Sequence, residues 1–324
     1  MTTTSTKKNR KVDTDWILWA LAAIATAAAL LPVVGNALVW DDEYLILGAE
    51  GLGDPDRLGR MLTVPFWHNS DYLLGEPEDY WRPLTTLVLW LGGLLFGEWA
   101  AGYHALSLLG ALFAAAGLAA LARRVAGPRH IAWRYAALVF IAHPLAAEIV
   151  CQTANLSDHL VLGFTCFTTL AILRALEDRS GRLRALAVAS ALAAGACAAK
   201  ELGLVVVLAP LFAFLLRRNE DDSFPLTRLA APGPLFAVAL PAAGYLVGRH
   251  LVTSAAGHSA IDPPSLLVYA RALFFGGGQC LATILAPFPR GTSAIVRSTD
   301  PIAIAWGVVA LTGIATLADR KSVV

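Results

Sequence analysis

Long apolar runs separated by short charged segments dominate this chain. The first run extends from Trp16 to Trp40, and about 20 apolar residues are enough to cross the hydrocarbon core of a bilayer. This run is too long for the core of a signal peptide and lacks a small-residue cleavage site before the next charged stretch, so it predicts a retained span at 16–39. Further spans are predicted at 102–122, 132–149, 159–176 and 229–250.

The apolar run at 184–216 differs from the others because basic residues bound it on both sides. Only Lys200 and Glu201 interrupt it. Each half of about 16 residues would span about 24 Å as a helix, which predicts two short helices that turn at this charged pair. The short segment Pro83–Gly97 predicts an interfacial or partly re-entrant helix, and 265–287 either crosses or lies along the external face. The pattern therefore predicts an all-α polytopic membrane protein with eight or nine spans.

Composition supports a membrane class and excludes a nucleic-acid partner. Hydrophobic residues make up 57% of the chain and charged residues 15%. The formal net charge is +1, and the charges lie in short segments instead of on one basic face. No repeat of 30 to 50 residues is visible, so tetratricopeptide repeats are not expected. We expect a polar cytoplasmic tail at 1–15 and a single membrane domain at 16–324.

The distribution of charge predicts the orientation of the chain in the membrane. Residues 41–82 are strongly acidic and are interpreted as a large first external loop with interfacial helices. Basic residues gather on the cytoplasmic side of membrane proteins, which places the N-terminus there. The recurring basic clusters expected on the same cytoplasmic side are Arg123, Arg124, Arg129 and Arg134, then Arg174, Arg179, Arg182 and Arg184, then Arg217, Arg218 and Arg228.

Candidate chemistry begins where the first span ends, at Trp40-Asp41-Asp42-Glu43. Partial desolvation and like-charged neighbours raise the pKa of a carboxyl group toward the range of a general base. The functional interpretation is a catalytic base. The structural alternative is a solvated acidic loop that only marks the external side, and the spacing alone favours neither.

Several short motifs then follow in one order along the chain. Together they resemble the polyprenyl-phosphate-sugar-dependent glycosyltransferases of the GT-C superfamily, in particular the O-mannosyltransferase branch that often carries tetratricopeptide repeats. The motifs are Val39-Trp40-Asp41-Asp42, Phe66-Trp67-His68 with Tyr80-Trp81-Arg82-Pro83-Leu84-Thr85, Gly102-Tyr103-His104, His143-Pro144 with Glu148, Val150 and Ser157-Asp158, and Lys200-Glu201-Leu202-Gly203.

The chain also departs from the family pattern. Ser107 and Gly110 stand where relatives usually have Asn and then His, and Leu156 replaces a common arginine two residues before Asp158. These departures affect the expected donor contacts but not Asp41. After about Pro225 the resemblance is weaker.

The resemblance implies transfer of a hexose, with mannose as the first expectation, from a polyprenyl or dolichyl phosphate to an acceptor hydroxyl on the external face. Asp41, with Asp42 beside it, is implied as the catalytic carboxylate, and the acceptor as protein Ser/Thr or a glycan. No cofactor is required, although Asp41 and Asp42 are also candidates for holding a divalent ion. The residues implied in binding the donor phosphate or substrate are Arg82, His104, His143, Glu148, Asp158, Lys200, Glu201 and Arg271.

Two other function classes stay open, namely a transporter or flippase of a lipid-linked or anionic substrate and an inactive GT-C-like scaffold. Structural roles are also open for the charged residues. Arg82 can anchor an interfacial helix by extending to the membrane surface, and Lys200 with Glu201 can form a structural ion pair. His104 and His143 are candidates for core histidines, and Glu148 and Asp158 for residues at helix ends.

Overall fold

The computed structural model describes part of the chain, and all of that part belongs to the first of its two units, residues 1–258 and 259–324. Arg271 and Glu148, and the segment 265–287, lie outside the described residues. The described residues are 24, 28, 30–70, 80–127, 130, 132–143, 149–178, 180–216 and 232–256.

Helices and turns make up the described residues, and no β-strand occurs among them. The all-α class predicted from the apolar runs is thus confirmed. In chain order the elements are η1 (Leu31–Gly35), η2 (Glu43–Leu47), α2 (Leu58–Leu62), η3 (Phe66–Asn69), α3 (Pro83–Phe96), α4 (Ala100–Ala126), α5 (Ala132–Ala142), η5 (Thr153–Asn155), α7 (Leu156–Glu177), α8 (Arg182–Ala199), η6 (Glu201–Leu208), α9 (Ala209–Leu216) and α10 (Pro232–Ala255).

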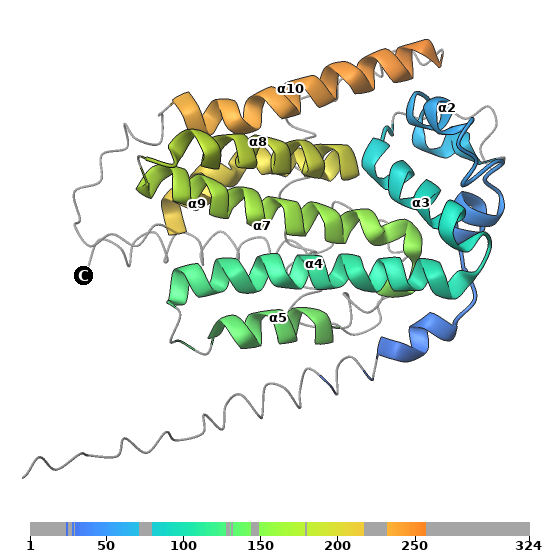
Figure 1. Ribbon diagram of the computed structural model, residues 1–324, viewed down its shortest axis with the longest axis horizontal. Helices are drawn as coiled ribbons and strands as arrows, with labels where there is room; N and C mark the ends of the chain where they lie inside the picture. Colours follow the sequence, from blue (N-terminus) through green and yellow to red (C-terminus); the bar gives the residue numbers. More distant parts are fainter. Residues whose placement is uncertain are drawn as a thin grey trace, which may run out of the picture. The chain divides into compact units, whose positions relative to one another are not determined.

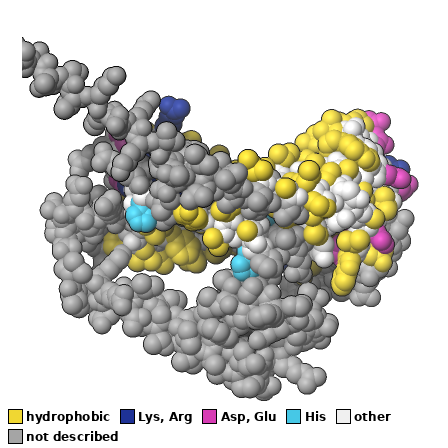
Figure 2. Space-filling view, turned by 90° about the horizontal axis from the view of Figure 1, so that it is seen from below, with side chains coloured by type: hydrophobic (Ala, Val, Ile, Leu, Met, Phe, Trp, Pro, Cys, Tyr) yellow, Lys and Arg dark blue, Asp and Glu magenta, His cyan; other side chains and the backbone are white. Residues whose placement is uncertain are grey.

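Four of the described helical segments are long and apolar enough to cross a membrane. They are Ala100–Ala126, Thr153–Glu177, Arg182–Ala199 and Pro232–Ala255, which match four predicted runs. Their outward faces carry large apolar side chains, and hydrophobic side chains cover much of the described surface in Figure 2. Such a surface is stable against lipid, so the fold is that of an all-α membrane protein. The total of eight or nine spans stays a prediction.

The end of the predicted first span differs from expectation. Residues 31–35 form a turn of 3-10 helix, and Asn36 is already extended, with φ −76° and ψ 157°. Pro32 has no N–H to donate, and Gly35-Asn36 favours a helix end. The helix therefore ends before Val39, and an extended segment leads to Asp41.

Helices α4 and α7 lie side by side and run in the same direction, α8 runs in the opposite direction, and α7 packs against both α4 and α8 (Figure 1). The chain turns at Lys200 between α8 and η6 and returns through α9, as the two apolar halves predicted. Shorter helix α3 lies beside α2 at one end of the long helices in Figure 1. Its 14 residues extend about 21 Å, less than the thickness of a bilayer core, which agrees with the expectation that it does not span.

Small residues allow these helices to pack closely. Ala189, Ala193 and Ala196 of α8 are fully buried in the core shared by α7, α8, α9 and α10. A Cβ added to Gly203 would lie 1.9 Å from the carbonyl oxygen of Ala196, so only glycine fits there. Close backbone approach through small side chains is the usual way in which helices associate in lipid. This packing places the turn at Lys200 firmly beside the start of α7.

Candidate active site

Seven of the predicted site residues gather at one end of the long helices, namely Asp41, Asp42, Arg82, His104, Asp158, Lys200 and Glu201. Asp42 contacts η5, the turn directly before α7, Lys200 pairs with Asp158 in the first turn of α7, and Arg82 pairs with Glu201. The arginines predicted to face the cytoplasm, such as Arg123, lie near the other ends of these helices. The opposite placement of the two groups agrees with the charge pattern of the sequence.

Asp42 is a buried carboxylate held by backbone donors. Its side chain is 0% exposed, its Oδ2 accepts a hydrogen bond of 2.9 Å from Thr153 N–H, and its Oδ1 accepts one of 2.6 Å from Ala154 N–H. Burial raises the pKa of Asp42, although the two N–H donors and the nearby His104 act in the opposite direction. Asp42 therefore joins the segment after the first apolar run to η5, the turn directly before α7.

Asp41 has the opposite environment from its neighbour. It is exposed, and no hydrogen bond or ion pair joins its carboxylate to another residue in the part of the chain that the structure describes. The preceding residue, Trp40, is 69% exposed and has φ 57°, a left-handed conformation that is unfavourable for a bulky side chain. Strained backbone of this kind is common at functional sites, and here it comes directly before Asp41 and a turn of π-helix, η2. Of the two carboxylates, Asp41 is thus the one that is accessible from outside the fold.

His104 holds the same segment from the side of α4. Its ring is fully buried, and Nε2 lies 3.3 Å from the carbonyl oxygen of Ala37, a group that only accepts hydrogen bonds, so Nε2 acts as the donor in this contact. Tyr103 beside it is also buried and donates to the carbonyl oxygen of Gly97, closing the turn between α3 and α4. The Gly-Tyr-His motif therefore positions the chain just before Asp41. The contact is compatible with the alternative of a core histidine, and the role of His104 in donor binding stays a prediction.

Arg82 and Glu201 form a partly buried pair. Nε of Arg82 lies 3.2 and 3.1 Å from the two carboxylate oxygens of Glu201, and Nη2 lies 3.1 Å from Oε2. The two side chains are only 12% and 19% exposed. The guanidinium also lies over the rings of Phe66 and Tyr80, at 4.9 and 5.0 Å from their centroids. Paired charges and stacked rings fix the orientation of Arg82.

Lys200 and Asp158 form a second ion pair at the same end. Nζ of Lys200 lies 2.9 and 2.8 Å from the two carboxylate oxygens of Asp158. The structural alternative in which Lys200 pairs with Glu201 is therefore wrong, because each residue pairs with a different element. Adjacent residues at the extended turn after α8 point in different directions, so α7 receives Lys200 and the start of α3 receives Glu201.

Trp81 connects the arginine to α10. Its Nε1–H donates to the carbonyl oxygen of Leu62, and its ring stacks on Tyr245, with centroids 5.6 Å apart. The Tyr245 hydroxyl donates in turn to the carbonyl oxygen of Trp81 at 2.9 Å. Sequence reasoning missed Tyr245, which lies far along the chain in an otherwise apolar helix. A tyrosine within a span was the signal available, since its hydroxyl needs a partner.

The three departures from the family pattern lie in one region between α4 and α7. A Cβ added to Gly110 would lie 2.2 Å from Cδ1 of Leu156, so the leucine packs directly on the glycine. Ser107 lies one turn away on α4, and its buried Oγ has no hydrogen-bond partner within the described residues. The buried hydroxyls of Thr153 and Ser157 and both ring nitrogens of His159 are in the same situation. A leucine and a glycine thus replace two polar residues together, beside the elements that hold Asp42.

Of the other predicted site residues, the structure describes His143 but not Glu148 or Arg271. His143 is half-buried just after α5. Both oxygens of Asp42 accept backbone hydrogen bonds, and the described residues include no group of three or more His, Cys, Asp or Glu positioned to hold a metal. A divalent ion at Asp41 or Asp42 stays a prediction.

The fold and this cluster define an all-α membrane protein with a charged site at one end of its helices. The chain belongs to the dolichyl-phosphate-mannose-protein mannosyltransferase family, whose model matches residues 77–255, more than half of its length. It is thus a membrane glycosyltransferase of the GT-C type, as its motifs indicated. No curated protein and no solved structure matches the chain. Asp41 and Asp42 precede the matched residues, so the match assigns no role to either of them.

Proposed function

We propose that this protein transfers a hexose, with mannose as the first candidate, from a polyprenyl phosphate to an acceptor hydroxyl on the external face of the membrane. The observation that carries the proposal is the contrast between two adjacent carboxylates. Asp42 is held at η5, directly before α7, by two backbone donors, and Asp41 beside it is exposed and unpaired within the described residues. A rigid support next to an accessible carboxylate suits a general base.

The proposed reaction is a single displacement with inversion at the anomeric carbon. The acceptor oxygen, from a protein Ser or Thr, attacks the anomeric carbon, and its proton passes to the carboxylate of Asp41. The bond between this carbon and the phosphate oxygen breaks, and its electron pair stays with the leaving polyprenyl phosphate. Stabilisation of the charge on that phosphate is the second requirement of the site.

Arg82 and Lys200 are the described cations suited to that second role. Glu201 occupies Nε and Nη2 of Arg82, while Nη1 has no hydrogen-bond partner among the described residues. Lys200 uses its Nζ toward both oxygens of Asp158, and an ammonium group has three N–H donors. Each cation thus keeps a donor for a phosphate while its carboxylate partner holds it in place. The role of Arg271 in donor binding stays a prediction, because this residue lies outside the described part of the chain.

The test is sugar transfer from radiolabelled polyprenyl-phosphate-mannose by the purified full chain, comparing the natural sequence with Asp41→Asn and Glu43→Gln. Glu43 is an exposed acidic neighbour and serves as the matched control. We expect Asp41→Asn to lower the rate by about 100-fold or more, because loss of a general base costs about that much. Glu43→Gln should keep the natural rate. Equal rates for the natural chain and Asp41→Asn would reject Asp41 as the base.

The packing of Leu156 on Gly110 is the one observation that favours an inactive scaffold instead, because it places apolar groups where relatives usually carry polar ones. The same assay separates the two functions. Absence of transfer by the natural chain across several polyprenyl-phosphate sugars would reject the transferase and favour the scaffold.

A further inference from the structure

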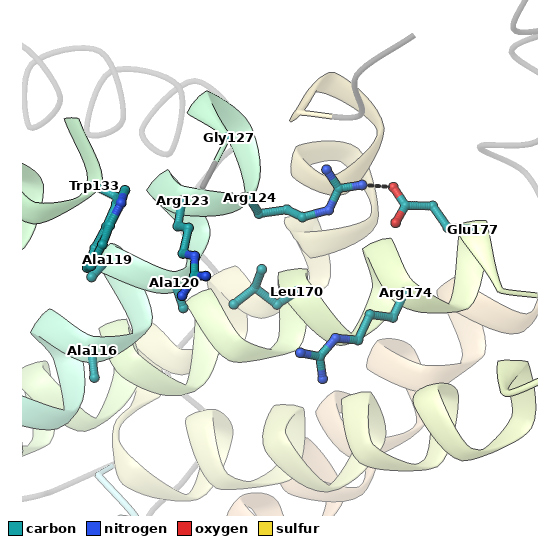
Figure 3. Close-up of a pocket in the computed structure, with 10 residues that line it drawn as sticks. All are labelled: Ala116, Ala119, Ala120, Arg123, Arg124, Gly127, Trp133, Leu170, Arg174 and Glu177. Atoms are coloured by element: carbon teal, nitrogen blue, oxygen red, sulfur yellow. Dashed lines mark hydrogen bonds and ion pairs between the residues drawn. The ribbon is translucent and has the colours of Figure 1, made fainter. Parts of the chain in front are cut away.

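A second charged region lies at the opposite end of the helices from Asp41. A cavity of about 760 Å³ opens there between α4, α7 and Trp133 at the start of α5 (Figure 3). His104 and Arg123 are 19 residues apart on α4, a rise of about 28 Å. The cavity is therefore separate from the proposed active site. Its size is within the range of small-molecule binding sites.

Arginines form the polar part of this cavity. Arg124 pairs with Glu177, as Figure 3 shows, and the guanidinium of Arg123 lies 5.6 Å from the ring centroid of Trp133. Arg174 is exposed and has no hydrogen bond or ion pair from its side chain to any described residue. Three arginines with one glutamate leave an excess of two positive charges facing the cavity. The charge is suited to a phosphate-bearing anion.

An apolar wall continues from these arginines toward the middle of the helices. Ala116, Ala119 and Ala120 lie on the same face of α4 as Arg123, because residues three and four apart stack along a helix. Leu170 of α7 lines the other side, and in Figure 3 it lies between Arg123 and Arg174. Small side chains on α4 thus leave a groove that is apolar toward the centre of the span and basic at its end.

We propose that this cavity binds one acidic phospholipid. Its phosphate would contact Arg123 and Arg174, and an acyl chain would lie along the alanines of α4. Basic pockets between membrane helices on the side where basic residues gather recognise such head groups. A free phosphate shares the polar chemistry but has no group to place in the apolar groove. The lipid belongs to the leaflet opposite the proposed sugar transfer.

The experiment is native mass spectrometry of the purified full chain in a nonionic detergent, titrated with phosphatidylglycerol or with phosphatidylcholine of the same acyl chains. We expect one phosphatidylglycerol per chain, bound about tenfold more tightly than phosphatidylcholine, since paired arginine–phosphate hydrogen bonds are strong. Arg174→Gln should weaken phosphatidylglycerol binding about tenfold. Arg184→Gln is the matched control, because Arg184 is an exposed arginine at the start of α8, outside the cavity. It should bind like the natural chain.

Two further measurements do not depend on the folding of the Arg174→Gln variant. Ala120→Phe fills the apolar groove without changing charge and should also weaken binding, whereas excess inorganic phosphate should not displace the lipid from the natural chain. Displacement by phosphate would show a site for the free ion and overturn the lipid assignment. Equal binding of both lipids, or equal weakening by Arg184→Gln and Arg174→Gln, would show only general attraction of anions and would also overturn it.

Discussion

The carboxylate of Asp42 accepts a hydrogen bond of 2.6 Å from the backbone N–H of Ala154, a residue 112 positions further along the chain. Together with the hydrogen bond from Thr153, this contact joins the segment after the first apolar run to η5, the turn directly before α7. A buried carboxylate with two backbone donors supports the fold, whereas the exposed Asp41 does not contribute such contacts. The two neighbouring residues should therefore respond differently to the same substitution.

Asp42→Asn is expected to destabilise the protein by about 1–3 kcal/mol at neutral pH. Asparagine has one acceptor oxygen, so its NH₂ group would face one of the two backbone donors and leave it unsatisfied. Thermal unfolding of the purified chain in detergent measures the effect. Asp41→Asn is the control and should unfold at the temperature of the natural chain; a similar loss in both variants would contradict the distinct roles.

The pH dependence of this difference follows from the raised pKa of Asp42. A carboxyl group with a raised pKa stabilises the fold fully below its ordinary pKa of 3.8, and that contribution is lost as the pH rises through the raised value. The advantage of the natural chain over Asp42→Asn should therefore decrease from acid toward neutral pH. Melting temperatures of the natural chain and of Asp42→Asn, measured from acid to neutral pH, test this prediction. If the stability advantage of the natural chain grew with pH, the backbone donors would lower the pKa of Asp42 by more than burial raises it.

Arg82 and Glu201 should show strong energetic coupling. Removal of one partner leaves a mostly buried charge without its counterion, so Arg82→Gln and Glu201→Gln should each destabilise by about 2 kcal/mol or more. The double variant should cost less than the two single losses added together. A double-mutant cycle based on thermal unfolding measures this coupling. If the two single losses simply add in the double variant, the ion pair contributes little to the free energy of unfolding.

Gly110 and Leu156 should be coupled through steric contact. Gly110→Ala places a methyl group against Leu156, and we expect a loss of about 1–3 kcal/mol from overpacking. Leu156→Ala leaves a cavity and should cost about 2–5 kcal/mol. In the double variant the added methyl fills part of that cavity, so the second change should be tolerated better than on the natural background. Unfolding temperatures of the natural chain, the two single variants and the double variant test this. If Gly110→Ala costs as much in the Leu156→Ala background as in the natural chain, the helices already separate at this position.

Features that depend on the bilayer could be predicted from the sequence. The thickness of the membrane fixes the length of an apolar run that crosses it, so the positions of α4, α7 and α10 follow from hydrophobicity within a few residues. The turn at Lys200 also follows, because a charged pair between two apolar halves must reach a polar surface. The exception is the end of the first apolar run. The helix ends soon after Pro32, at Gly35, several residues before the predicted span ends at Val39.

The amino-acid sequence was thus enough to predict the class of fold, the helices long and apolar enough to cross a membrane, and the charged residues that share one end of the described helices. The pairing of these residues depends on the tertiary structure, which joins Lys200 to Asp158, Arg82 to Glu201, and Asp42 to the backbone of Thr153 and Ala154. Side chains of adjacent residues point in different directions, which sequence order does not reveal. Backbone N–H donors are present at nearly every residue, so only the fold shows which of them meet a carboxylate.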